Sequence, residues 1–264
     1  MWNIIIQRLK EQRNSIIYYA MGLIAYAWMV MAVFPSFSGV DFTEFFEAYP
    51  EDLLKFFGGT DAMTMTTIEG FLSIEFLNFF FILIILFYIG AAAGSVIAGR
   101  IENKNMDFFL SQPISRTKIV VSETLVTLFY SIILVFATSF SILGFAQVYD
   151  IDIGFDGLMA FSIVAIFLLW AIYGIAIFLS SFLKSKISTT LGTVFIVFAM
   201  YIFYAMTEIV EKLEDYDKFS IFYLYTPQEL LTEAEINWTQ IGTLFLIFII
   251  GLGLSLFIFH KRDV

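Results

Sequence analysis

Six long apolar runs, separated by shorter polar segments, dominate the hydrophobic pattern of this 264-residue chain. Each run can cross a hydrocarbon core of roughly 30 Å, which takes about 20 mostly apolar residues in a helix. The pattern predicts an all-α polytopic membrane protein in which one transmembrane domain, residues 1–264, holds six transmembrane helices. We place the spans at about 15–34, 72–99, 118–147, 157–183, 187–206 and 240–259.

The charged residues alternate in sign from one gap to the next. Eleven of the fourteen lysines and arginines lie before the first run, between runs two and three, between runs four and five, or after the last run. The exceptions are Lys55, Lys212 and Lys218. Acidic residues concentrate in the remaining gaps, within 41–75, 150–156 and 208–235. Because basic residues accumulate in cytoplasmic loops, this alternation predicts that both termini are cytoplasmic.

The segment before the first run has an amphipathic pattern. Trp2, Ile5, Ile6 and Leu9 lie at helical spacing, with polar and basic residues on the other faces. This pattern predicts an N-terminal interfacial helix over residues 2–13, in the inner headgroup region. The alternative is a plain cytoplasmic extension of the first span. A charged start without a small-residue cleavage site does not fit a cleavable signal peptide.

Two outer segments are too charged to span a membrane and too aromatic for free loops. The first follows Pro35, where we expect the first span to end, and covers residues 41–57. Its pattern predicts two short amphipathic outer helices, resting on the outer leaflet or capping the bundle. The second covers residues 207–239, and its aromatic middle can return into the bilayer where protein shields it.

The second run ends in a series of small residues, GAAAGSVIAG at 90–99, which permits close helix packing in lipid. Gly90 and Gly94 form a GxxxG pair. Because this motif occurs often by chance in apolar helices, packing within the chain is favoured over a dimer interface.

Composition supports a membrane protein without catalytic chemistry of its own. Hydrophobic residues make up 60% of the chain, which has 33 phenylalanines, one histidine and no cysteine, well beyond the apolar share of soluble domains. The chain has no nucleophile motif, metal-ligand cluster or Gly-rich phosphate loop. We therefore expect that it is not an enzyme. Glu75 and Glu123 lie near the ends of spans, where we expect them to snorkel, and without a relay of acids a proton-driven antiporter is disfavoured.

The gap between the second and third runs, RIENKNMDFFLSQPISRTK at 100–118, is the most informative segment. It places Met106, Phe108, Phe109 and Leu110 among charged residues, and an exposed apolar cluster of this kind normally docks against a partner. A short helix ending before Pro113 would present these side chains to a groove. The alternative is that they fold back onto the membrane surface.

This segment resembles the signature of type-2 ABC-exporter membrane subunits, in which an acidic residue precedes an LLS-x-P-[IV]-S-R pattern. The matching positions are Glu102, Leu110, Ser111, Pro113, Ile114, Ser115 and Arg116. The resemblance extends to the six spans, the N-terminal interfacial helix, the long first outer loop and the broken outer segment before the last span. It covers essentially the whole chain.

The resemblance implies a permease subunit of an ATP-binding-cassette exporter in a prokaryotic plasma membrane. Two copies of a separate cytoplasmic ATPase would bind ATP and Mg, so that this chain itself holds no cofactor. A second permease copy, or a homologous permease, would complete the translocation path in the lipid bilayer, and no nucleic acid is expected as partner. A cytoplasmic coupling helix between spans two and three would dock into the ATPase, and the resemblance implies coupling roles for Glu102, Met106, Asp107, Phe108, Phe109, Leu110, Pro113 and Arg116.

Two other functions stay open from the residues alone. A carrier or channel not driven by ATP would need charged residues facing a central pathway, and the spans contain few. A membrane sensor or immunity protein could bind a peptide or lipid through the aromatic outer loops. For an exporter as for a carrier, the apolar spans favour a hydrophobic or amphipathic substrate such as a lipid, a peptide or a drug.

Overall fold

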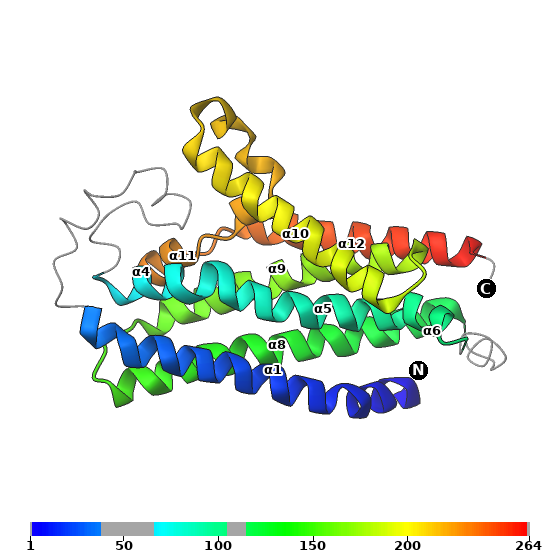
Figure 1. The fold of residues 1–264 in the computed structure, drawn as a ribbon, viewed down its shortest axis with the longest axis horizontal. Helices are drawn as coiled ribbons and strands as arrows, with labels where there is room; N and C mark the ends of the chain where they lie inside the picture. Colours follow the sequence, from blue (N-terminus) through cyan, green and yellow to red (C-terminus); the bar gives the residue numbers. More distant parts are fainter. Residues whose placement is uncertain (1, 38–65, 105–114, 263–264) are drawn as a thin grey trace.

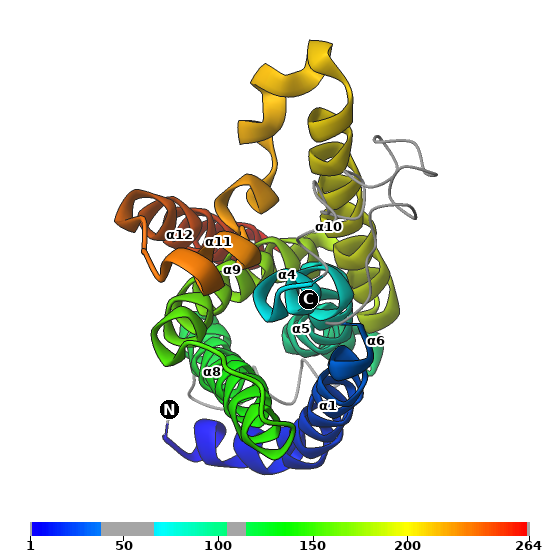
Figure 2. The same cartoon turned by 90° about the vertical axis from the view of Figure 1, so that its left-hand side faces the viewer.

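The computed structural model describes residues 2–37, 66–104 and 115–262. Within these ranges the regular structure is helical, and six helical segments are long and apolar enough to cross a membrane. Most of these segments lie side by side as an elongated bundle, whereas Lys186–Ile209 runs at an angle to the others and its later part projects from the bundle (Figure 1 and Figure 2). The predicted all-α fold with six spans is confirmed.

The spans are α1 (Trp2–Phe37), the continuous series α4 (Ile68–Leu72), η2 (Ser73–Phe81) and α5 (Ile82–Val96), then α8 (Arg116–Val148), α9 (Phe155–Phe182), α10 (Lys186–Ile209) and α12 (Trp238–Lys261). A short helix, α6 (Ala98–Glu102), follows α5. Between α10 and α12 lie η3 (Glu211–Phe219), η4 (Ile221–Leu224) and α11 (Pro227–Glu233). The η2 segment is a π-helix, a geometry that sequence periodicity does not reveal.

Short polar side chains begin three of the spans. Ser115, Ser185 and Asn237 accept hydrogen bonds from backbone N–H groups two or three residues ahead, at 3.3, 3.0 and 3.0 Å. Such side chains satisfy N–H groups that the first helical turn leaves without a partner. The starts of α8, α10 and α12 are therefore encoded locally.

The first span is longer than predicted at both ends. Residues 2–13 form the first turns of α1, so the predicted N-terminal helix continues directly into the span, and Figure 2 shows that α1 curves along its length. Ile5 and Leu9 pack against the core, whereas Trp2 is exposed. At the other end α1 continues through Pro35 to Phe37, so the expected end at residue 34 is wrong. Proline removes one backbone hydrogen bond, and α1 ends two residues after Pro35.

Helix α9 lies at the centre of the bundle (Figure 2). It is the most buried of the six spans and packs against α12, α5, α8 and α10, while α1 packs along α8. Glycine allows α9 and α12 to approach closely, because a Cβ on Gly174 would lie 2.7 Å from the Cα of Phe248. Buried hydroxyl groups add hydrogen bonds between spans, such as Ser139 to Ser162 at 2.7 Å.

The small-residue segment of the second span faces α10. A Cβ added to Gly90 would lie 3.1 Å from the Cα of Thr190, and one added to Gly94 would lie 2.9 Å from the carbonyl oxygen of Lys186. Both glycines therefore permit close contact between two helices of the same chain. This confirms the prediction of packing within the chain.

The broken segment after α10 returns to the bundle at η4, after η3, in which Tyr216 and Phe219 are exposed. Ile221, Phe222 and Tyr225 are buried, and the Tyr225 hydroxyl donates to the carbonyl oxygen of Leu77 at 3.1 Å. The aromatic middle of the segment is thus shielded by protein, as the prediction of a returning segment requires. The predicted outer helices over residues 41–57 lie outside the described residues.

Candidate functional site

Both termini lie at the same end of the bundle (Figure 1). This end of the bundle contains the start of α1, the short helix α6, the start of α8, the junction of α9 and α10, and the end of α12. We call it the basic end, because these element ends carry Arg8, Arg100, Arg116, Lys118, Lys184, Lys186, Lys261 and Arg262.

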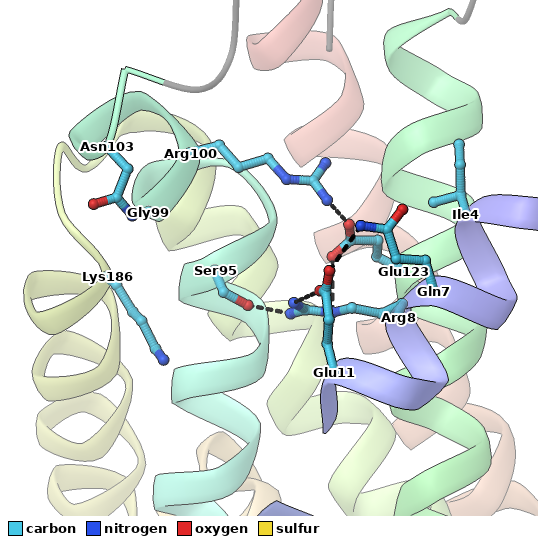
Figure 3. Close-up of a pocket in the computed structure, with 10 residues that line it drawn as sticks. All are labelled: Ile4, Gln7, Arg8, Glu11, Ser95, Gly99, Arg100, Asn103, Glu123 and Lys186. Carbon is cyan, nitrogen blue, oxygen red and sulfur yellow. Dashed lines mark hydrogen bonds and ion pairs between the residues drawn. The ribbon is translucent and has the colours of Figure 1, made fainter. Parts of the chain in front are cut away.

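A buried carboxylate lies at the basic end. Glu123 of α8 has only 1% of its side chain exposed, and its Oε2 lies 3.1 Å from Nε of Arg8 on α1. Its other oxygen pairs with Arg100 of α6. Figure 3 shows the two guanidinium groups reaching this carboxylate from different elements. The two guanidinium groups compensate the buried carboxylate as ion-pair partners. This ion-pair network connects three separate segments of the chain.

Polar side chains around Arg8 extend the network. Arg8 donates to the Ser95 hydroxyl and forms an ion pair with Glu11 at 3.4 Å. Gln12 is buried, and with its amide oriented to suit both neighbours it accepts from Arg8 Nε at 2.8 Å and donates to the Tyr88 hydroxyl at 2.8 Å. The first turns of α1 are therefore bonded to both α5 and α8.

The expectation that Glu123 snorkels to the interface is wrong. Its carboxylate points into the protein because two arginines from other segments neutralise it there. The sequence contained one signal for this site: an ionisable residue inside an apolar run usually faces a partner within the bundle. The identity of the partners, Arg8 and Arg100, depends on tertiary packing and was not foreseen.

Burial, and after it the nearby charge of Arg8, lower the pKa of Arg100 to about 10, while Glu11 acts in the opposite direction. Even so, the guanidinium stays cationic at neutral pH. The direction of the Arg8 contribution shows that positive charge is concentrated at this site.

A cavity of about 280 Å³ adjoins the ion-pair network. We call it the polar cavity; Figure 3 shows its lining, with Lys186 of α10 across from the arginines. Its lining residues are Ile4, Gln7, Arg8, Glu11, Ser95, Gly99, Arg100, Asn103, Glu123 and Lys186. The described residues contain no group of three or more His, Asp or Glu able to hold a metal ion.

The residue predicted to precede the coupling segment binds the start of α10. Glu102, at the end of α6, accepts a hydrogen bond from the backbone N–H of Lys186 at 2.9 Å. A carboxylate at this position also interacts favourably with the positive end of the helix dipole. Glu102 thereby connects the chain before residue 105 to the fifth span.

The residue predicted to follow the coupling segment binds the end of the last span. Arg116 donates to the carbonyl oxygens of Phe259 and Arg262 at 2.6 and 2.7 Å, and its guanidinium lies 5.1 Å from the centre of the Phe259 ring. Arg262 in turn donates to the carbonyl oxygens of Ser181 and Leu183 at 2.7 and 3.0 Å. Two arginines therefore connect the start of α8 with the ends of α12 and α9.

The other predicted coupling residues lie outside the described residues: Met106, Asp107, Phe108, Phe109, Leu110 and Pro113. Glu102 and Arg116, which flank them, are not brought together by the fold. Each binds a different span, α10 and α12 respectively. The bonds of Arg262 to the end of α9 were not predicted, because a basic residue at the inner end of a span is equally consistent with a lipid headgroup contact.

A second feature lies between η2, α10 and η4. Phe79, Phe198, Tyr201 and Phe222 form an aromatic cluster in which ring centres lie 5.3 to 6.5 Å apart. These rings line a small cleft together with Asn78. Aromatic rings in such edge-to-face, tilted and stacked contacts offer a largely apolar surface, to which the Asn78 amide and the Tyr201 hydroxyl add polar groups.

Comparison with known families places the chain in a family of membrane permeases. A family model described as "Multidrug efflux system permease Rv1217c, C-terminal domain" matches residues 8–260, nearly the whole chain. Comparisons with curated proteins and with solved structures gave no significant match.

Proposed function

Because this chain belongs to the family of the C-terminal domain of the multidrug efflux system permease Rv1217c, we propose that it is the permease subunit of an ATP-binding-cassette exporter. The chain is a multi-pass membrane protein with six apolar helices. In the proposed complex it forms the translocation path and couples to a separate cytoplasmic ATPase, which binds ATP and Mg. The chain itself then carries no enzymatic activity.

One observation carries this proposal. The two flanks of residues 105–114 are bonded to the ends of different spans, Glu102 to α10 and Arg116 to α12. A force applied to the intervening segment by a partner would therefore act directly on two spans, and through Arg262 on the end of α9. This arrangement suits a coupling segment whose apolar residues, Phe108 and Phe109 among them, dock into an ATPase.

The substrate we propose is hydrophobic or amphipathic, such as a lipid, a hydrophobic peptide or a drug. The aromatic cluster supports this class, because Phe79, Phe198, Tyr201 and Phe222 offer an apolar surface between the second and fifth spans. The path would lie between this chain and a second permease copy or a homologous permease. The distribution of basic residues supports cytoplasmic termini, in a prokaryotic plasma membrane.

Co-purification tests the proposal directly. The tagged chain would be isolated in mild detergent from its native membrane, and the proteins that accompany it identified by mass spectrometry. Recovery of an ATPase with a phosphate-binding Gly-rich loop, lost in the F108A/F109A double variant and kept in the Q112A control, is the expected result. Unchanged ATPase recovery and unchanged substrate-stimulated hydrolysis in the double variant would contradict the coupling role.

A carrier not driven by ATP is the runner-up, and the buried Glu123 is the observation that favours it, because intramembrane carboxylates often take part in ion coupling. A pH gradient imposed on proteoliposomes that contain only this chain separates the two functions. Drug efflux driven by that gradient, in the absence of ATP and of any ATPase, would favour the carrier. The exporter requires the ATPase subunit and ATP.

A further inference from the structure

The polar cavity contains more positive than negative charge. Its wall has three cations, Arg8, Arg100 and Lys186, and two carboxylates, Glu11 and Glu123. Both carboxylates are already engaged. Glu123 pairs with both arginines, and Glu11 pairs with Arg8 and accepts from the Gln7 amide at 2.9 Å. The cavity therefore has a positive charge that its own acids do not balance.

Burial makes this charge effective. Only 11% of the Arg8 side chain and 12% of the Arg100 side chain are exposed, so water screens the two guanidinium groups poorly. The charge of Arg8 contributes to the lowered pKa of Arg100, which is the effect of one cation on another. An anion bound beside them would favour both charged forms.

The remaining donors suit an oxyanion. Neither the Lys186 ammonium nor the Asn103 amide has a hydrogen-bond or ion-pair partner among the described residues, and both line the cavity. Guanidinium, ammonium and amide groups are the donors that bind phosphate oxygens in proteins. The cavity volume of about 280 Å³ exceeds the roughly 30 Å³ share of one liquid water many times, so a phosphate group with part of its ester fits.

We propose that the polar cavity is a binding site for a phosphate group, supplied by an anionic phospholipid or by a soluble phosphate ester. The site lies at the basic end, which the charge distribution predicts to be cytoplasmic. Basic pockets between transmembrane helices on that side bind anionic headgroups in other membrane proteins. The site does not depend on the proposed ATPase partner, and binding can be measured on the isolated chain.

Reconstitution in lipid nanodiscs tests the site. The wild-type chain would be compared in discs of phosphatidylcholine alone and in discs containing phosphatidylglycerol, with thermal unfolding and the mass of retained lipid as readouts. Phosphatidylglycerol should raise the unfolding midpoint of the wild-type chain and remain bound after detergent extraction. Lys186→Gln should lose at least half of that increase. The matched control, Lys184→Gln, should keep all of it, because exposed Lys184 does not line the cavity.

Soluble anions distinguish the two sources. Inorganic phosphate and glycerol phosphate would be added to phosphatidylcholine discs, with sodium chloride at equal ionic strength as control. Stabilisation by phosphate or its ester, dependent on Lys186, assigns the site to a soluble ligand, and stabilisation only by phosphatidylglycerol assigns it to lipid. The proposal is overturned when none of the three anions stabilises the chain, namely phosphatidylglycerol, inorganic phosphate and glycerol phosphate, or when Lys184→Gln and Lys186→Gln lose the effect equally.

Discussion

Gly251 on α12 faces the backbone of Gly174 on α9 so closely that a Cβ added to Gly251 would overlap the Gly174 carbonyl oxygen. The contact holds the last span against the central helix of the bundle. In lipid, where neighbouring tails are as apolar as leucine, such close backbone packing is a main source of helix association.

Gly251→Ala should therefore destabilise the protein. The new methyl group has no space, so we expect a loss of about 1–3 kcal/mol from overpacking, measured as a lower unfolding midpoint in detergent. Gly253, two residues further on, has open space around its Cα. Gly253→Ala should leave stability unchanged or raise it by up to about 1 kcal/mol through helix propensity. Equal effects of the two substitutions would show that α9 and α12 do not pack through these glycines.

The buried ion-pair network gives a second prediction. Glu123→Gln leaves Arg8 and Arg100 buried without their shared carboxylate, and removing one partner of a buried pair typically costs about 3–5 kcal/mol. The folded fraction recovered from membranes should fall, and the thermal midpoint should fall with it.

Two further variants show whether the loss comes from charge. Glu11 is about half exposed, and Glu11→Gln should cost no more than about 1 kcal/mol, as at other exposed pairs. The double variant Glu123→Gln/Arg8→Gln removes one cation together with the anion. Its loss should be smaller than the sum of the two single losses, because contacting residues are not additive. Additive losses would mean that Arg8 and Glu123 act independently.

The sequence predicted what depends on local pattern. The length and apolar character of each run were sufficient to predict the six spans. The prediction that Gly90 and Gly94 pack within the chain was also confirmed, because both glycines lie against the backbone of α10.

What the sequence did not predict depends on which segments meet. The Gly174–Gly251 contact joins two glycines on different helices, and neither has a distinctive spacing. The position of Glu123 near the end of its span suggested that its carboxylate extends to water. Instead, the carboxylate is buried and pairs with arginines of α1 and α6. Likewise, the pattern around Pro35 predicted a helix end, but α1 continues two residues beyond this proline, to Phe37.

Arg116 should control the order of the last turn of α12. It neutralises two carbonyl groups at the negative end of the helix dipole, an interaction worth about 0.3–2 kcal/mol, so Arg116→Ala should release this turn. The chain has no cysteine, and a spin label on a cysteine introduced at the exposed His260 would report the change. We expect greater label mobility in Arg116→Ala than in the control Lys118→Ala, whose side chain is exposed. Equal mobility in both would show that Arg116 does not hold the end of α12.

Cysteine labelling can also test the membrane orientation. The chain has no cysteine of its own, so single cysteines can be introduced without background labelling. If basic residues mark the cytoplasmic side, cysteines at the basic end should react with a membrane-impermeant maleimide only after cells are permeabilised. Suitable exposed positions are Asn103, Lys184 and Lys261. Cysteines at exposed positions of the opposite end, namely Asp150, Asp152 and Glu235, should react in intact cells. Labelling of all six after permeabilisation establishes that each is accessible. The reverse pattern in intact cells would place both termini outside, and residues 105–114 would then be out of reach of any cytoplasmic ATPase.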